Sequence, residues 1–450
     1  MQTRFSTAQL ADPGIAESNR ILRACVHCGF CTATCPTYVL TGDELDSPRG
    51  RIYLIRDMLE RGGSPDARTV HHLDRCLTCL GCMTTCPSGV HYLHLVDHAR
   101  AHIERTYGRP WRERWRRGAL LWLMSRPWRF RIGLTIGRLV RPLRTLLPRP
   151  LQRLVDLAAG TRLRRRAAPR PEARRTTPAG AARDAHADAA IRRVALLPGC
   201  VQPALRPAIN DAATRLLQRC GIEVLDAGDI GCCGALAHHL GRDDRSLAQA
   251  GAAIDGWLAL QAQGALDAIV VTAGGCGTLM KDYGFLFRGD ASRADGAARV
   301  AAMTRDIAEL LDGVALPPVV CGRGLRVAYH AACSLRHGQR IAAAPQRLLR
   351  AAGFEVLEIP EGHLCCGSAG TCNLLQPELS DELLARKLAG IGTLRPDAIA
   401  LGNLGCLTQL ERGATVPVLH TVELLDWATG GPVPQGMEAL VLAGDGRRNT

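Results

Sequence analysis

The cysteines of this chain include two runs with the same spacing, and this feature constrains the fold more than any other in the sequence. Each run has the pattern C-x2-C-x2-C-x3-C-P: Cys25, Cys28, Cys31, Cys35 and Pro36, then Cys76, Cys79, Cys82, Cys86 and Pro87. Three thiolates spaced in this way can wrap a short loop around one [4Fe–4S] cluster, and the fourth ligates the other cluster of a pair. Zinc sites more often pair C-x2-C units across a long gap. The two runs therefore predict two [4Fe–4S] clusters.

The remaining cysteines argue for metal chemistry in a reducing compartment. The 450-residue chain has 19 cysteines, an odd number, and some are adjacent in the sequence, which does not suit a disulfide framework.

Residues 1–20 contain no apolar run of the kind that a signal peptide needs, and no stretch approaches the length of a membrane-spanning helix. We therefore expect a cytoplasmic protein, and leave open a peripheral contact with the cytoplasmic face of the inner membrane.

The net charge of +14 is unevenly distributed, because arginines are concentrated between Arg109 and Arg175. They alternate there with Trp, Leu and Pro, and the rest of the chain is closer to balance, so a nucleic-acid partner is not expected. Residues 109–190 are predicted to be a basic amphipathic segment and linker, with residues 163–190 disordered. The tryptophans suit either a helix pair packed on the core or a surface that binds anionic lipid.

Helix signals surround both cysteine runs. Ser47 and Pro48 are typical of a helix start, and apolar residues at helical spacing follow until Gly62. Further helices are expected at 14–23 and 92–106. Residues 1–108 are therefore predicted to form a mainly helical domain of the two-cluster ferredoxin type.

The rest of the chain is a duplication. The first copy has expected strands at 194–197, 222–225 and 268–272 and helices at 204–219 and 246–263; the second has strands at 325–329, 354–359 and 397–401 and helices at 345–352 and 378–389. This alternation is typical of small α/β units with a mostly parallel sheet. The predicted fold class is thus α+β multidomain, with a helical ferredoxin module followed by two α/β Cys-Cys-Gly repeats at 191–320 and 321–450.

Cysteines recur at matched positions in the two copies, just beyond a strand or in a glycine-rich turn. The two sets are Cys200, Cys232, Cys233 and Cys276, and Cys333, Cys365, Cys366 and Cys406. Ligands collect at this edge of α/β folds, and four thiolates suit a further iron–sulfur cluster or an all-cysteine zinc site. Cys220, Cys321 and Cys372 have no counterpart and are expected to be ordinary thiols. His330, His337 and His363 flank second-copy cysteines and are candidates to tune or ligate a metal.

No nucleotide-binding signature accompanies the cysteines. The sequence has neither a G-x-G-x-x-G between a strand and a helix nor a P-loop. Iron–sulfur centres move single electrons, so a two-electron oxidation needs an organic cofactor. That cofactor and the substrate pocket are expected on another polypeptide, and no catalytic residue is predicted here.

Several segments resemble the glycolate oxidase iron–sulfur subunit. They are residues 23–38 around the first run, 47–54 (SPRGRIYL), 74–79 (DRCLTC), 363–370 (HLCCGSAG) and 403–406 (NLGC). The resemblance covers nearly the whole chain and is weakest at 109–193. It implies a complex in which FAD-containing subunits oxidise glycolate to glyoxylate, and this chain passes the electrons to membrane quinone or another acceptor.

The same resemblance implies which cysteines act together. One cluster takes Cys25, Cys28, Cys31 and Cys86, and the other takes Cys76, Cys79, Cys82 and Cys35. Relatives such as heterodisulfide reductases end each repeat in C-x-x-C, whereas the final position here is Leu279 or Gln409. The five-thiolate cluster of those relatives is therefore not expected, and an ordinary cubane, zinc or an empty site remain open.

Other functions also remain open from the sequence. A similar subunit could serve a lactate or an anaerobic glycerol-3-phosphate dehydrogenase, and the copurified flavoprotein would tell these apart. The chain could instead catalyse disulfide reduction at its Cys-Cys-Gly sites, as a heterodisulfide reductase does. A zinc-bearing nucleic-acid binder would lack a brown iron–sulfur chromophore.

Overall fold

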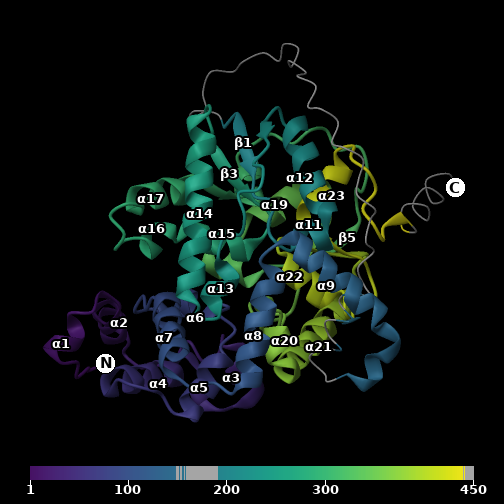
Figure 1. Cartoon of the computed structure of the whole chain (residues 1–450). Helices are drawn as coiled ribbons and strands as arrows, with labels where there is room; N and C mark the ends of the chain where they lie inside the picture. Colours follow the sequence, from purple (N-terminus) through teal and green to yellow (C-terminus); the bar gives the residue numbers. More distant parts are fainter. Residues whose placement is uncertain (148–151, 153–154, 157, 159–190, 439, 441–450) are drawn as a thin grey trace.

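The computed structural model describes the chain except for residues 148–151, 153–154, 157, 159–190, 439 and 441–450. A helical N-terminal module lies below two α/β repeats, the first drawn in teal and the second in green to yellow (Figure 1). Each repeat has its own parallel sheet. The predicted fold class is therefore confirmed, whereas the linker predicted at 163–190 lies outside the described residues.

The N-terminal module consists of short helices that bracket the cysteine loops. They are α1 (Thr7–Leu10), α2 (Pro13–Ala24), α3 (Pro36–Thr41), η1 (Glu44–Asp46), α4 (Pro48–Arg61), α5 (Ala67–Asp74), α6 (Gly81–Thr85) and α7 (Tyr92–Thr106). α4 begins where the sequence predicts it, since the Ser47 hydroxyl accepts a hydrogen bond from the Gly50 amide at 2.9 Å. The apolar faces of α2, α4, α5 and α7 form the core of the module.

Helices α8 (Trp111–Met124) and α9 (Pro127–Leu139) join the module to the repeats, and a 3-10 turn, η2 (Arg141–Leu146), follows. α8 is anchored on the module because Arg117 donates to Asp74 at 2.8 Å, and on the first repeat because Leu121 packs against Leu240. The four tryptophans of these two helices are each more than half exposed: Trp111, Trp115, Trp122 and Trp128. The helix pair therefore packs on the core through one face, as the first interpretation predicts, and presents tryptophan on the other. Binding of anionic lipid by that exposed face stays a prediction.

Each repeat is built on a four-stranded parallel sheet, ordered β2-β1-β3-β4 in the first and β6-β5-β7-β8 in the second. The strands are β1 (Arg193–Leu196), β2 (Glu223–Leu225), β3 (Ala268–Val271), β4 (Thr304–Asp306), β5 (Arg326–His330), β6 (Glu355–Glu358), β7 (Ala398–Leu401) and β8 (Val418–His420). Val194 faces Ala268, and Val327 faces Ala398 in the same register, which makes Leu197 the counterpart of His330. The short edge strands β4 and β8 were not predicted, because three residues are too few to show a period.

Helices cover both faces of each sheet. In the first repeat they are α11 (Gln202–Leu205), α12 (Pro207–Arg219), α13 (Ala235–His239), α14 (Asp243–Ala262), α15 (Gly274–Lys281), α16 (Tyr283–Leu286), α17 (Ala294–Met303) and α18 (Ile307–Asp312). In the second they are η3 (Ser334–Gly338), α19 (Ala344–Ala351), α20 (Cys372–Leu375), α21 (Pro377–Leu394), α22 (Leu404–Leu410) and α23 (Thr421–Ala428). The prediction of a single helix at 204–219 is wrong, because the structure has two helices that meet just before Pro207. Proline lacks the amide hydrogen that would continue the hydrogen bonds of the first helix.

The two repeats pack on each other reciprocally. α12 of the first packs on α23 of the second, and α18 of the first packs on α19 of the second. Arg215 and Arg219 on α12 donate to the buried Asp426 on α23 at 2.5 and 2.6 Å. One apolar core runs through both repeats. The cysteine-bearing edges of the two sheets are thereby held in a fixed relation to each other.

Candidate metal centres

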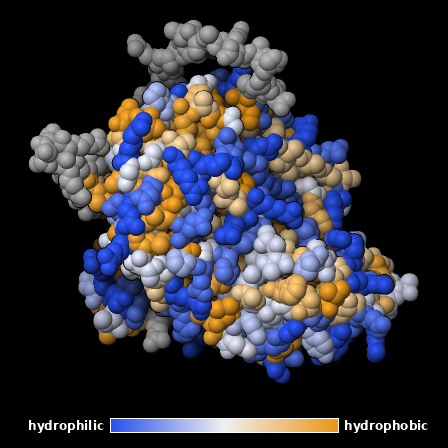
Figure 2. Space-filling model, turned by 180° about the vertical axis from the view of Figure 1, so that it is seen from behind, coloured by the Kyte–Doolittle hydropathy of each residue, from blue (hydrophilic) through white to orange (hydrophobic). Residues whose placement is uncertain are grey.

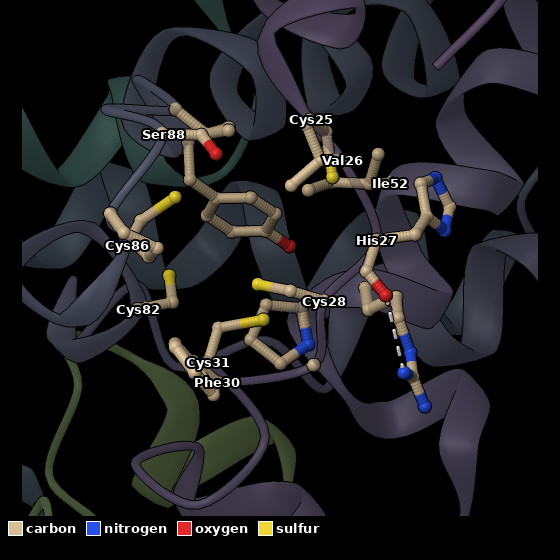
Figure 3. A pocket seen from close by; sticks show the side chains of 16 residues that line it. Cys25, Val26, His27, Cys28, Phe30, Cys31, Ile52, Cys82, Cys86 and Ser88 are labelled. Atoms are coloured by element: carbon tan, nitrogen blue, oxygen red, sulfur yellow. Dashed lines mark hydrogen bonds between the residues drawn. The ribbon is translucent and has the colours of Figure 1, made fainter.

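The first group of thiols comes from both cysteine runs. Cys25, Cys28 and Cys31 of the first run line a cavity that is open to solvent, together with Cys86 of the second. Figure 3 shows their sulfur atoms turned toward a common space. Cys82 also borders this cavity, and Cys35 is not among its lining residues. This grouping is the one that the resemblance implies, and ligation by these residues stays a prediction.

The second group is more deeply buried and also draws on both runs. Cys76, Cys79 and Cys82 interact electrostatically with one another, and Cys35 acts on Cys79 and Cys82. Cys35 lies at the start of α3, with its Sγ 3.1 Å from the Thr37 hydroxyl. Burial, and then the neighbouring thiols, raise the pKa of Cys79 and of Cys82 well above the ordinary value. Such thiols become thiolates readily only when a metal neutralises them.

Both cysteine loops use the same left-handed backbone. φ is positive at His27 and Gly29 in the first loop and at the equivalent Thr78 and Leu80 in the second. This conformation costs a residue other than glycine about 1–2 kcal/mol. The same costly conformation occurs at matched positions of both loops. This indicates that both loops need the same curvature, which turns three sulfur atoms inward.

Buried arginines supply positive charge beside the second group. Arg51 on α4 is 1% exposed, and its Nη1 lies 3.8 Å from Cys35 Sγ. Arg100 on α7 donates to the Cys76 carbonyl oxygen at 2.5 Å. Burial alone would raise the pKa of Cys76, but Arg51 and Arg100 bring it below the ordinary value. These two arginines, which the sequence reasoning missed, therefore favour negative charge at this group.

Four cysteines of the first repeat meet at the C-terminal edge of its sheet. Cys200 follows β1, the pair Cys232 and Cys233 follows β2, and Cys276 lies in the first turn of α15 after β3. Cys200 and Cys233 both interact directly with Cys232, which lowers the pKa of Cys232 well below the ordinary value. Cys233 also contacts Cys276. The structure thus brings the predicted set together.

The second repeat also brings its four cysteines together, but different side chains surround them. Its thiols form a chain of direct contacts in the order Cys333, Cys365, Cys366 and Cys406. Contact with Cys365, together with burial, raises the pKa of Cys333 well above the ordinary value. Lys387 on α21 is 4% exposed and acts electrostatically on the first three of these thiols. The second site therefore has a buried cation beside it.

Other side chains occupy the positions at which a fifth thiolate is absent. Leu279 is buried in the apolar core of the first repeat. Gln409 is fully buried and donates from Nε2 to Ser380 Oγ at 2.8 Å and to the Cys366 carbonyl oxygen at 3.4 Å. Gln409 thus braces the backbone of the cysteine pair, and neither residue offers a soft ligand.

The glycine of each Cys-Cys-Gly segment allows a helix to approach closely. Gly234 and Gly367 have φ values of +90° and +86°. A Cβ would lie 2.9 Å from the Ser246 carbonyl oxygen of α14 in the first repeat, and 2.6 Å from the Ser380 carbonyl oxygen of α21 in the second. Both the positive φ and the lack of space therefore require glycine here.

The second group of the module lies against the second repeat. Cys79 interacts electrostatically with Cys333 and Cys365. One apolar cluster joins the two sides and includes Leu77, Cys79, Cys333, Cys365, Cys372, Leu379 and Leu383. The first repeat meets the module through α7, where His238 Nε2 lies 3.1 Å from Asp97 Oδ2. Three of the four thiol groups therefore form a contiguous series from the first group to the second repeat.

Comparisons with known proteins agree with this arrangement. The 4Fe-4S dicluster domain family matches residues 24–90, and the Cysteine-rich domain family matches residues 194–281 and 327–411. The chain is 41% identical over 428 residues to a protein of Escherichia coli (strain K12) named glycolate oxidase iron-sulfur subunit, covering 95% of this chain and 99% of that one. The chain belongs to the family of glycolate oxidase iron–sulfur subunits.

Membership in this family confirms the predicted electron-transfer role and iron–sulfur cofactors. A probable glycolate oxidase iron-sulfur subunit of Bacillus subtilis (strain 168) is 30% identical, over 90% of this chain and 94% of that one. Lactate utilization protein A of Geobacillus thermodenitrificans (strain NG80-2) is 27% identical over 52% of this chain and 98% of that one.

A solved structure, that of a hypothetical protein from Helicobacter pylori, has the same fold. Its TM-score is 0.52 at 10% sequence identity, and the match covers 96% of this chain and 75% of that one. Among the residues described for this chain, no helix is both long and apolar enough to cross a membrane.

Proposed function

We propose that this chain is the electron-transfer subunit of a complex whose FAD-containing partner subunits oxidise glycolate to glyoxylate. The observation that carries the proposal is the 41% identity, over nearly the full length of both chains, to a glycolate oxidase iron–sulfur subunit. The match to a lactate utilization protein spans only about half of this chain and supports the broader class. When bound, [4Fe–4S] clusters supply carriers of single electrons.

The proposed ligands of the two ferredoxin-type clusters are the two crossed groups of thiols. The first is Cys25, Cys28, Cys31 and Cys86, and the second is Cys76, Cys79, Cys82 and Cys35. The two repeat sets are proposed to hold further metal centres. The chain itself holds the thiols in place, excludes water from the second group, and supplies compensating positive charge through Arg51 and Arg100.

We propose that electrons from the partner flavin enter beside Cys28. This thiol is exposed, and Val26 and Phe30 of the same loop are 66% and 63% exposed. Exposed apolar side chains beside a redox site suit a surface that a partner subunit covers. The series of groups then leads inward to Cys79 and Cys333. Exit is therefore proposed at the second repeat.

The acceptor is proposed to be a quinone in the cytoplasmic membrane. Helices α8 and α9 are proposed to bind the surface of that membrane. Arg129 stacks over Trp122 and Trp128, with its guanidinium carbon 4.7 and 5.2 Å from the two rings. Ile132 and Ile136 are also about half exposed. Tryptophan combined with arginine suits the headgroup region of an anionic bilayer. Figure 2 shows the molecule from behind relative to Figure 1, and on that face hydrophobic residues lie in separate groups among hydrophilic ones.

The electron-transfer proposal is tested with the purified complex, glycolate and a quinone analogue. Cys28→Ala should abolish reduction of the quinone analogue, while glycolate still bleaches the partner flavin. Cys220→Ala is the matched control, since Cys220 has no counterpart in the other repeat and should be dispensable. Full quinone-linked turnover in Cys28→Ala, or reduction of the flavin by lactate or glycerol-3-phosphate and not by glycolate, would contradict the proposal.

The membrane proposal is tested by cosedimentation with vesicles. The complex should bind vesicles that contain phosphatidylglycerol more strongly than vesicles of phosphatidylcholine alone, and salt should weaken binding. Trp122→Ala combined with Trp128→Ala should reduce binding about tenfold or more without affecting glycolate-dependent flavin reduction. Binding that is unchanged in this double variant would contradict a role for α8 and α9.

A further inference from the structure

A histidine lies among the thiols of the second repeat. His330 ends β5, is 0% exposed, and has no counterpart in the first repeat, where the equivalent residue is Leu197. A ring nitrogen of His330 and the sulfurs of Cys366 and Cys406 all lie within 4.8 Å of one another. His330 ends β5, Cys366 lies in the loop after β6, and Cys406 lies in α22 after β7. Because β5 pairs with both β6 and β7, the sheet brings the three residues together.

Neither ring nitrogen of His330 has a hydrogen-bond partner among the described residues. A neutral imidazole carries one donor and one acceptor, and leaving each unpaired in the protein interior costs about 1–3 kcal/mol. The same strand position accepts leucine in the first repeat, where Leu197 is 3% exposed. An apolar residue would therefore fit at position 330, and the imidazole needs a partner that the described part of the chain does not supply.

The spacing of the three donors suits a single metal ion. Bonds of about 2.0–2.3 Å to a tetrahedral ion place two donors about 3.5–3.8 Å apart. This separation is compatible with three ligand atoms that all lie within 4.8 Å of one another. Imidazole and thiolate together bind zinc and iron. Gln409 occupies the sequence position at which a further thiolate is absent. Its amide nitrogen is engaged with Ser380 and the Cys366 backbone, so His330 is the better candidate for a ligand beside the thiols.

We propose that His330 is a metal ligand in the second repeat, sharing one ion with Cys366 and Cys406. The two repeats then differ in chemistry: the first offers thiolates alone, and the second offers thiolates and one imidazole. A neutral imidazole in place of a thiolate makes a centre less negative, which raises its reduction potential if the ion belongs to an iron–sulfur cluster. The inference rests on the proposal above that the second repeat holds a metal.

The test compares the full chain with five variants, using metal analysis, pulsed EPR on protein labelled with ¹⁵N-histidine, and X-ray absorption at the zinc and iron edges. Cys366→Ala reports whether the second repeat holds metal. His330→Leu introduces the first-repeat residue, His330→Cys restores a ligand, and His330→Gln keeps hydrogen bonding but is a poor ligand. Leu197→Ala controls for disturbance of a buried strand end.

The expected result is a histidine nitrogen bound to iron or zinc in the wild-type protein and absent from His330→Leu. The affinity for that metal should fall at least tenfold in His330→Leu and His330→Gln, and recover in His330→Cys. Loss of metal in Cys366→Ala but not in His330→Leu would overturn the role of His330 alone, as would wild-type behaviour in His330→Gln. No loss of metal in Cys366→Ala would overturn occupancy of the second repeat and leave the glycolate proposal standing.

Discussion

Replacement of Arg51 by methionine should lower the reduction potential of the cluster bound by the second group. Arg51 lies 3.8 Å from Cys35 Sγ and is almost fully buried, so little water screens its charge. At an effective dielectric constant of about 20, a unit charge about 7 Å from the centre of an added electron contributes about 2.4 kcal/mol. With about 1.4 kcal/mol per 59 mV for one electron, the expected fall is on the order of 100 mV.

The variant should still fold, although at a cost. Arg51 donates to Asp46 at 3.3 Å, and breaking such a buried pair costs about 3–5 kcal/mol. Asp46 keeps Arg75 at 2.8 Å and His72 at 2.9 Å, so its carboxylate is not left alone. The loss of stability should therefore lie near the lower end of that range.

The assay is an EPR-monitored redox titration of the purified complex, with iron and sulfide counts to show that the cluster is present. Arg51→Lys keeps the charge and should shift the potential less than Arg51→Met. Arg61→Met is the matched control on the same helix, because Arg61 pairs with Asp57 at the surface and should leave the potential unchanged. Wild-type potentials in a fully loaded Arg51→Met protein would refute the electrostatic reasoning.

Three further predictions concern the thiol groups and the contact between the module and the first repeat. Cys86→Ala should alter the EPR signal of the same cluster as Cys28→Ala, and a change in the other cluster instead would contradict the crossed grouping. Cys232→Ala should lower the metal content of the chain, and an unchanged content would argue against a centre in the first repeat. Burial alone would lower the pKa of His238, but Asp97 raises it to about 8. The protonated pair therefore contributes about 2 kcal/mol that is fully present below about pH 6.5 and is lost as the pH rises through about 8. Urea unfolding at pH 6 and pH 9 should show this loss in the wild type, and a loss of the same size in Asp97→Asn would contradict the role of the pair.

Much of the fold could be predicted because its signals are local. The matched Cys-Cys-Gly spacing predicted the duplication, and the Ser47 cap predicted the start of α4 to the residue. The short strands β4 and β8 could not be predicted, because three residues show no alternation of apolar and polar side chains. The break between α11 and α12 was missed because a proline is also compatible with the first turn of a helix.

The candidate sites were predictable in their thiols but not in their surroundings. Arg51 lies on the apolar face of α4 together with Ile55 and Met58. A charged residue at a position that the helical spacing predicts to be buried was the signal that could have identified it. His330 was visible only as one of three histidines near the second set. Its closeness to Cys366 and Cys406 depends on how adjacent strands are registered, which no single segment of sequence contains.

The most direct test of the account is the iron and acid-labile sulfide content of the full chain purified without oxygen. Two cubanes held by the crossed thiol groups predict at least about eight irons and eight sulfides per chain, and occupied repeats raise both counts. A chain that contains zinc in place of iron, with fewer than about four irons and no sulfide, would contradict the claim that it carries electrons through iron–sulfur clusters.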